Sequence, residues 1–292
     1  MTSEQNGKAR ATLIGFSAVA LWALLALFTV GAQPVPALQL NAMCFAIGGL
    51  IGVVWLAATG SFAILRSVPL RVYAFGTAGL FGYHYLYFSA LSLAPPAEAG
   101  LIAYLWPLLI VLFSGLLPGE RLRAGHILGA LIAFGGAALI VAKGGISASS
   151  DALPGYALAF LCALTWSGYS LVSRRFGAVP TAAVTVYCLA TSVLALGAHL
   201  AIEETIWPAT TLGWTSVLAL GLGPVGLAFF TWDIGVKRGD IQLLGTASYA
   251  APLLSTLALI LAGFATATPM IIVAAAMIAA GAFLAAIAGR RR

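Results

Sequence analysis

The chain has 292 residues, of which 62% are hydrophobic and only 8% are charged. Because soluble domains carry about 25% charged residues, this composition excludes a water-soluble globular fold and indicates a protein whose surface faces a lipid bilayer. The net charge of +6 comes from small basic clusters between apolar segments and not from a long basic run, so we expect no nucleic acid as a partner.

Ten apolar segments follow one another along the chain, each close to the length of about 20 residues that an α-helix needs to cross the hydrocarbon core. They run over residues 11–31, 37–58, 71–93, 97–117, 124–142, 154–173, 181–201, 212–233, 241–263 and 268–288. Their apolar residues do not alternate with the period of two that barrel strands require. The sequence therefore predicts an all-α polytopic membrane protein with ten transmembrane helices, spans one to ten. The first span is longer than the core of a signal peptide, which predicts an uncleaved anchor.

The basic residues predict the orientation of the spans, because cytoplasmic loops carry an excess of Lys and Arg. With the N-terminus inside, 13 of the 14 Lys and Arg residues fall in cytoplasmic segments, and only Lys143 lies outside. The cytoplasmic set is Lys8, Arg10, Arg66, Arg71, Arg121, Arg123, Arg174, Arg175, Lys237, Arg238, Arg290, Arg291 and Arg292. We therefore expect a multi-pass protein of the bacterial inner membrane with both termini in the cytoplasm.

One phrase occurs twice, as "GLIAYLWPLL" at residues 100–109 and as "GTASYAAPLL" at residues 245–254. The copies lie in spans four and nine, and because an odd number of spans separates them, the two halves are expected to have opposite orientations. Inverted repeats are typical of secondary transporters, which hold the substrate near the midplane where the halves meet. We expect a first five-helix repeat at 11–142, an external linker at 143–153 and a second five-helix repeat at 154–288. The alternative is a packing face that two helices share by chance.

The repeated phrase also predicts a break in each of the two spans. The helix-break or hinge residues are Gly100, Pro107, Gly245 and Pro252. Proline has no N–H group and its ring clashes with the preceding turn, so the carbonyl groups of Ala103 and Ser248 are expected to be free to meet an ammonium group. The glycines let neighbouring helices approach closely.

Ionisable side chains inside a membrane are costly and therefore mark function. His84 lies near the middle of span three, where we expect it to face the substrate or a gate. The alternative is a histidine that joins two helices by a hydrogen bond. Spans one to seven have no Asp or Glu near the midplane, which argues against proton-coupled export of lipophilic cations, because that exchange needs a buried carboxylate.

Aromatic residues form the other candidate for a substrate site. The predicted substrate-binding set is Tyr83, His84, Tyr87, Tyr104, Trp106, Trp166, Tyr169, Trp232 and Tyr249. Deep phenol groups need partners or a wet cavity, whereas the alternative, an interfacial belt, places Tyr and Trp at the membrane surface. We assign Trp22, Trp207 and Trp214 partly to that belt. Trp106 is expected to point away from Tyr104 unless Pro107 bends the helix.

The segment "AYLWPLLIVLFSGLLPGERLRAGHILGALIAFGGAALIV" resembles the ten-helix, EamA-type members of the drug/metabolite transporter superfamily. The resemblance rests on Pro107, on Gly119-Glu120 and on the glycine-rich fifth span, and it covers the chain as two EamA units. Within the superfamily, "GYHYLYFSALSLAPPAEAGLIAYLWPLL" is most similar to bacterial exporters of aromatic amino acids. The resemblance implies a transporter with a small apolar or aromatic substrate.

We therefore expect an inner-membrane carrier that exports aromatic and other neutral amino acids or related metabolites by alternating access, facilitated or weakly coupled. The alternative is a proton-coupled exporter of broader metabolite or drug range in the same superfamily. An enzyme is not expected, because no His-x-x-x-His, cysteine cluster or Gly-x-Ser-x-Gly is present. A channel is not expected either, because the sequence shows no charged ring that could line a pore. We expect no cofactor and no metal; the partners are the small-molecule substrate and the lipid bilayer, and the chain can act as a monomer.

Overall fold

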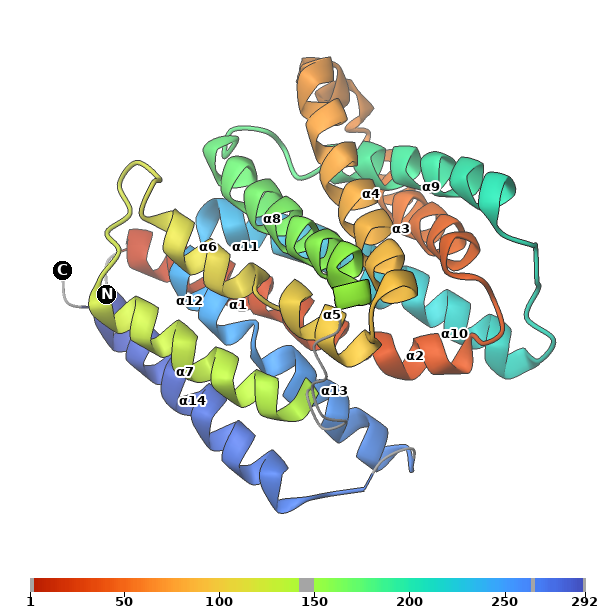
Figure 1. Cartoon of the computed structure of the whole chain (residues 1–292). Coiled ribbons are helices and arrows are strands. Elements are labelled where there is room, and N and C mark those ends of the chain that lie inside the picture. Colours follow the sequence, from red (N-terminus) through yellow and green to blue (C-terminus); the bar gives the residue numbers. More distant parts are fainter. Residues whose placement is uncertain (1–2, 142–149, 264–265, 291–292) are drawn as a thin grey trace.

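The computed structural model describes residues 3–141, 150–263 and 266–290, and these residues form helices and connecting segments without a strand. The helices are α1 (Ser3–Trp22), α2 (Leu25–Gly31), α3 (Ala37–Thr59), η1 (Phe62–Ser67), α4 (Leu70–Leu93), α5 (Pro96–Ala103), α6 (Trp106–Ser114), α7 (Ala124–Val141), η2 (Ser150–Ala152), α8 (Leu153–Arg175), α9 (Ala183–Ile202), α10 (Thr211–Leu222), η3 (Gly223–Leu227), α11 (Ala228–Arg238), α12 (Ile241–Ala247), α13 (Ala250–Leu261) and α14 (Pro269–Arg290) (Figure 1). Most of the predicted linker, including Lys143, lies outside the described residues, as do Arg291 and Arg292.

The ten predicted spans appear in order, and the prediction of an all-helical polytopic membrane fold is confirmed. Among the described residues, seven helical stretches are long and apolar enough to cross a membrane, two shorter apolar ones cover Glu98–Ser114 and Ala124–Ile140, and α4 supplies the tenth. Four spans consist of two helices each: α1 with α2, α5 with α6, α10 with α11 through the π-helical turn η3, and α12 with α13.

Spans four and nine are interrupted at equivalent places in the repeated phrase. Two residues separate α5 from α6, and two separate α12 from α13. Pro107 is the second residue of α6 and Pro252 the third of α13. Because proline cannot donate a backbone hydrogen bond and crowds the carbonyl four residues earlier, each helix ends one turn before its proline and a new helix begins. Whether these breaks act as hinges stays a prediction.

The helix pairs follow the pattern expected for two related five-helix units. The most extensive pairs are α7 with α14, α3 with α9, α4 with α8, and α1 with α11, and Figure 1 shows α7 beside α14. If spans one to five are exchanged with spans six to ten, the pairs α7–α14 and α3–α9 each map onto themselves. The pair α4–α8 maps onto the pair α11–α1. This arrangement is consistent with the predicted inverted repeat.

Small residues bring α7 and α14 into close contact. A Cβ atom on Gly129 would lie 2.5 Å from the Gly281 carbonyl oxygen, and one on Gly136 would lie 2.8 Å from the Ala274 carbonyl oxygen. The offset of the repeated phrase, 145 residues, relates Gly129 to Ala274 and Gly136 to Gly281. The second contact is therefore the image of the first, and small residues permit both approaches.

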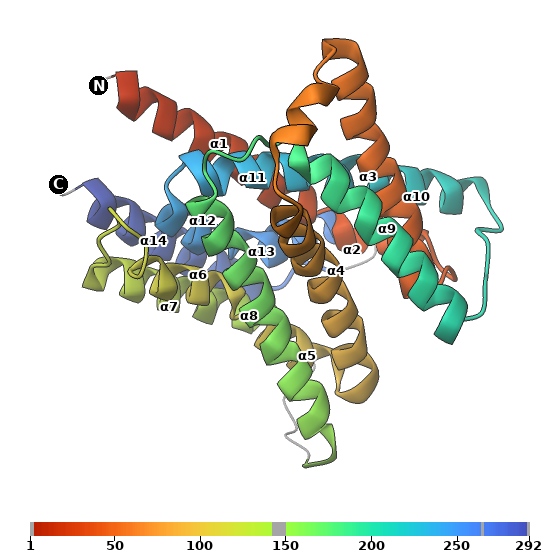
Figure 2. The same ribbon diagram turned by 90° about the horizontal axis from the view of Figure 1, so that it is seen from above.

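Both chain termini lie at one end of the bundle (Figures 1 and 2), which we call the termini end. Basic side chains join its loops: Lys8 lies 3.2 Å from the Asp240 carboxylate, and Arg174 pairs with Glu120. Arg174 also donates to the carbonyl of Val236, in the last turn of α11, and to that of Gly239, which follows α11. Arg123 donates to a carbonyl near the end of α14 at 2.8 Å. These basic residues therefore share one end, as predicted; which side of the membrane this end faces stays a prediction.

Candidate functional site

Aromatic rings from six spans meet in the middle of the bundle, and we call this group the ring cluster. Its members are Trp22, Phe45, Tyr83, His84, Tyr87, Trp106, Trp166, Tyr169, Phe229 and Trp232, and every ring centroid lies within 6.3 Å of another. These separations fall in the range where aromatic pairs attract one another. The cluster contains seven of the nine residues that the sequence predicted for substrate binding.

Trp106 brings span four into the ring cluster. Trp106 is the first residue of α6, and its ring meets Trp22 at 6.1 Å and Trp232 at 5.7 Å, both edge-on. Trp106 points away from Tyr104, which packs beside α7, as an uninterrupted helix would also arrange two residues that are two positions apart. Trp166 lies at the middle of the cluster, in contact with Tyr83, Trp22 and Phe229 as well.

The ring cluster is more enclosed on the side of the termini end. Phe75, near the start of α4, contacts Phe176, which directly follows Arg175, so α4 runs away from the termini end. Tyr83, His84 and Tyr87 lie farther along α4 and are partly exposed. In contrast, Trp106, Trp166, Tyr169 and Trp232 are 0–5% exposed. The partly exposed rings of α4 therefore lie farther from the termini end than Phe75 does.

His84 presents a hydrogen-bond acceptor in this accessible region. Its Nδ1 atom lies 2.8 Å from the Leu80 carbonyl oxygen. Because a carbonyl only accepts, Nδ1 carries the proton, and in the neutral ring Nε2 keeps a lone pair. Among the described residues Nε2 has no hydrogen-bond partner, and it is not one of the fully enclosed polar atoms. Three donor groups are in the same situation: they have no hydrogen-bond partner among the described residues and are not fully enclosed. They are the hydroxyl groups of Tyr83 and Tyr87 and the indole N–H of Trp166.

Other members of the predicted set have fixed partners. The Trp232 indole N–H donates to the Ser170 hydroxyl oxygen at 3.1 Å. Tyr169 stacks on Trp166 at 5.2 Å and packs on α4, where a Cβ atom on Gly79 would lie 2.5 Å from its ring. These two residues therefore close the cluster toward the termini end by packing.

Tyr104 and Tyr249 lie in a second group, beside α7 and α14. The Tyr249 side chain is fully buried, its ring lies 5.8 Å from Phe134, and its hydroxyl oxygen accepts a hydrogen bond from the Leu108 N–H at 3.0 Å. An uninterrupted helix would give that N–H to the Tyr104 carbonyl. Tyr104 is partly exposed, and its hydroxyl has no hydrogen-bond partner among the described residues. The two tyrosines of the repeated phrase thus differ in this conformation.

The prediction of two free carbonyl groups holds at one position only. The Ser248 carbonyl already accepts the Ala251 N–H at 3.0 Å, because the chain makes a tight turn between α12 and α13, so that expectation was wrong. At the other break the Ala103 carbonyl receives no backbone donor within the described part of the chain, since the residue four positions later is Pro107.

Three members of the ring cluster were missed by the sequence analysis. Trp22 was assigned partly to an interfacial belt, but its ring lies inside the cluster and its N–H donates to the Pro224 carbonyl at 3.0 Å. Phe45 is fully buried beside His84. Phe229 lies 6.0 Å from His84 and follows it by the same 145 residues that separate the repeated phrases, a signal that could have identified it.

The described residues contain no group of three or more His, Cys, Asp or Glu side chains that could hold a metal ion. The three cysteines, Cys44, Cys162 and Cys188, are buried and unpaired. Trp207 and Trp214, the other belt candidates, stack on each other at 6.0 Å and are largely exposed.

Comparison with known proteins places this arrangement in context. The model of the EamA-like transporter family matches residues 9–142 and 153–287, close to the two predicted units. The chain is 51% identical to the aromatic amino acid exporter YddG of Ancylobacter novellus, over 97% of this chain and 99% of that protein. It is 29% identical to the aromatic amino acid exporter YddG of Salmonella typhimurium, with the same coverage, and 30% identical to the pseudopaline exporter CntI of Pseudomonas aeruginosa over 70% of this chain and 71% of that one. A crystal structure with 52% sequence identity superimposes with a TM-score of 0.93, covering 97% of this chain and 98% of the other.

Proposed function

Because the chain belongs to the EamA-like transporter family, we propose that it exports aromatic and other neutral amino acids, or related metabolites, across the inner membrane. The family and its exporter relatives indicate a multi-pass membrane transporter and not an enzyme. The substrate class is the proposed part, and it is supported by the ring cluster and by the relatives that are named as exporters of aromatic amino acids.

The observation that carries the proposal is the partly exposed face of the ring cluster. An aromatic or apolar side chain can pack against Tyr83 and Tyr87, because these two parallel rings are partly exposed. An ammonium group can donate to the lone pair on His84 Nε2. A carboxylate can accept from the open tyrosine hydroxyls and the Trp166 indole N–H. Together these groups match the parts of a zwitterionic amino acid.

The broken spans supply a means of alternating access. In the present conformation the Tyr249 hydroxyl holds the first turn of α6 through the Leu108 N–H. We propose that the two repeats exchange conformations during transport, so that Tyr104 then holds the equivalent N–H of Leu253. Gly245 supports such a crossing, because a side chain there would meet the Pro107 carbonyl oxygen at 3.1 Å. The substrate would reach opposite sides of the membrane in the two states.

The proposal is tested with purified protein in liposomes loaded with unlabelled phenylalanine. Addition of a trace of labelled phenylalanine or tryptophan outside should give a transient accumulation by counterflow, as expected for a carrier, and alanine or threonine inside should drive it less. An equilibration without overshoot would indicate a channel. Counterflow that responds to neither aromatic nor small neutral amino acids would refute the proposed substrate class.

A further inference from the structure

A large cavity lies at the termini end, between α1 and α14. Its floor is α12, which contacts both of these helices. Its volume is about 1410 Å³. The apolar part is formed by Leu13 and Phe16 of α1, Leu243 and Ala247 of α12 and Ala286 of α14. We call this cavity the α12 groove; Figure 2 shows α12 between the two flanking helices.

The α12 groove opens toward lipid and is separated from the ring cluster. Leu13, on its wall, is 70% exposed although it lies in a membrane-spanning helix. Behind the groove, α1 and α11 touch: a Cβ atom on Gly15 would lie 2.7 Å from the Gly235 Cα atom and 3.0 Å from the side chain of Leu244, which is 1% exposed. This packing closes the path to the ring cluster, so in this conformation the groove is not the route of the transported substrate.

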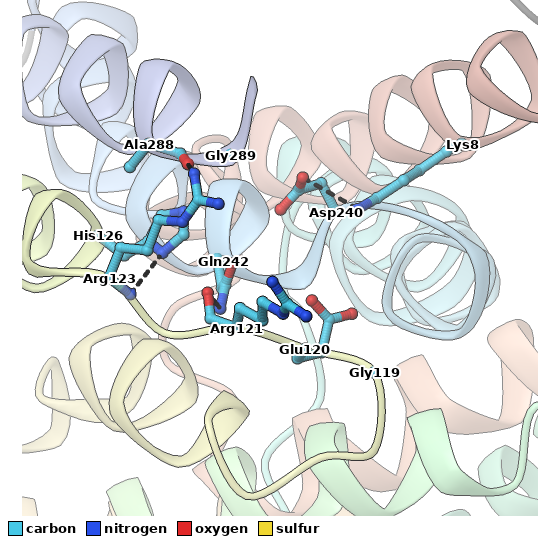
Figure 3. A pocket seen from close by; sticks show the side chains of 10 residues that line it. All are labelled: Lys8, Gly119, Glu120, Arg121, Arg123, His126, Asp240, Gln242, Ala288 and Gly289. Carbon is cyan, nitrogen blue, oxygen red and sulfur yellow. Dashed lines mark hydrogen bonds and ion pairs between the residues drawn. The ribbon is translucent and has the colours of Figure 1, made fainter. Parts of the chain in front are cut away.

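The mouth of the groove carries positive charge. It shares Lys8, Glu120 and Asp240 with an adjoining cavity of about 260 Å³, drawn in Figure 3, in which Arg121 and Arg123 face the same space. Both acids are neutralised, Glu120 by Arg174 and Asp240 by Lys8.

The Asp240 carboxylate remains charged at neutral pH and so stays paired with the Lys8 ammonium group. Burial raises the pKa of this carboxyl, but the ammonium group of Lys8 and the Leu243 N–H outweigh burial and lower the pKa below its usual value. Arg121 and Arg238 are exposed, and neither guanidinium forms a hydrogen bond or an ion pair with the described residues. Two guanidinium groups without a partner therefore remain, that of Arg238 on the groove and that of Arg121 on the adjoining cavity. Arg123, which donates to a carbonyl and not to a carboxylate, adds to the positive charge.

We propose that the α12 groove binds an anionic phospholipid from the leaflet at the termini end, with its phosphate between Arg121 and Arg238 and one acyl chain against Leu13 and Ala247. An apolar trough beside unpaired cations suits an amphiphile with a negative head group. A soluble anion would leave the trough unused, and a zwitterionic lipid would leave the two cations without a full negative charge. The site is independent of the transported substrate.

The test measures lipid binding to the purified full chain in neutral detergent by native mass spectrometry. The probes are phosphatidylglycerol, phosphatidylcholine with the same acyl chains, and inorganic phosphate. The variants are Arg121→Gln with Arg238→Gln, and, as a control, Arg66→Gln with Arg71→Gln, which removes the same charge from exposed residues outside both cavities.

We expect one phosphatidylglycerol to bind the unmodified protein and the control variant, and phosphatidylcholine to bind more weakly. Removal of Arg121 and Arg238 should weaken phosphatidylglycerol binding about 25-fold, because each basic group near an anionic lipid contributes roughly fivefold. Ala286→Trp should also abolish binding by filling the trough, while thermal unfolding without lipid stays unchanged for the arginine variants.

Several outcomes would overturn the proposal. Equal binding of phosphatidylglycerol to the two double variants would show that charge at this mouth does not select the lipid. Equal affinity for phosphatidylcholine would indicate an unspecific lipid contact. Displacement of the lipid by inorganic phosphate at the same concentration would indicate a site for small anions, and unchanged binding to Ala286→Trp would show that the acyl chain lies elsewhere.

Discussion

At the residue scale, the two tyrosines of the repeated phrase show how equal positions acquire unequal bonds. Tyr249 is fully buried and its hydroxyl accepts the Leu108 N–H at 3.0 Å. Tyr104 is partly exposed and its hydroxyl has no partner within the described residues. If the two halves exchange conformations as proposed, this pair of tyrosines distinguishes one half from the other in the present conformation.

Tyr249→Phe should destabilise the protein. The substitution removes the acceptor of the buried Leu108 N–H, and an unsatisfied buried donor costs about 1–3 kcal/mol. Thermal and denaturant unfolding in detergent should show the loss. Tyr104→Phe is the matched control, because its hydroxyl has no partner to lose, and equal unfolding of both variants would contradict the proposed role of the hydrogen bond.

Tyr83→Ala should change selectivity. If Tyr83 stacks on the substrate, its loss removes roughly 0.5–1.5 kcal/mol of attraction between rings, a few-fold to about tenfold in affinity for phenylalanine or tryptophan. Transport of alanine or threonine should change less. Tyr85→Ala on the same helix is the control, because Tyr85 is 40% exposed and turned away from the cluster. An equal loss for all amino acids would instead indicate a structural role for Tyr83.

At the element scale, the bundle is shaped by the close approach of α7 to α14 and by the breaks in spans four and nine. The pair α7–α14 is built on small residues, whereas spans four and nine are each divided beside a proline. The break in span four releases the Leu108 N–H, which donates to the Tyr249 hydroxyl oxygen. This hydrogen bond joins the two copies of the repeated phrase.

Gly129→Ala should weaken the contact between α7 and α14. The new Cβ atom would lie 2.5 Å from the Gly281 carbonyl oxygen, so the helices must separate, which typically costs 1–3 kcal/mol. Gly197→Ala in α9 is the control: no atom lies within 4 Å of its Cβ position, and alanine favours helix over glycine. Unfolding midpoints that fall equally, or not at all, would contradict this packing.

At the scale of the whole molecule, the two ends of the bundle differ. The termini end gathers the paired basic residues, and the partly exposed rings of α4 lie farther along that helix, away from this end. If the termini end is cytoplasmic, the present conformation is the one that has closed toward the cytoplasm.

The orientation is tested by reporter fusions. The basic residues predict that a fusion near Arg175 reports the cytoplasm and that one near Glu203 reports the periplasm. The structure places Arg175 beside the carbonyl of Leu116 and Glu203 at the start of α3, in separate loops. Reversed labelling would invalidate both the orientation and the proposed direction of closure.

Transport is expected to run down the substrate gradient without a coupled proton. Spans one to seven have no mid-membrane carboxylate, and Asp233 of span eight is held by Lys237 at 2.8 Å and by the Thr181 hydroxyl at 2.7 Å. A pH gradient imposed on liposomes should therefore not concentrate the substrate. Several-fold accumulation would favour the proton-coupled alternative, and its loss in His84→Gln would then locate the proton site.

The class of protein and the order of the spans can be predicted from the amino-acid sequence. Spans are recognised from composition because the bilayer demands long apolar helices, and the sharing of one end by Lys8, Arg123 and Arg174 follows from the number of crossings. The helix breaks were also predictable, because the effect of proline on a helix is local. The repeat identified Tyr104 and Tyr249 as equivalent positions.

The contacts between side chains of different spans could not be predicted and are seen in the folded protein alone. Trp22 lies in the ring cluster and not in a surface belt, and Phe45 belongs to the cluster as well. The Tyr249 hydroxyl oxygen accepts a hydrogen bond from a backbone N–H 141 residues away. The reason is physical. In a soluble helix the apolar stripe marks the buried face, but in a bilayer the lipid and the protein interior are both apolar, so periodicity does not distinguish them. The partner of each ring is then set by the crossing of other helices.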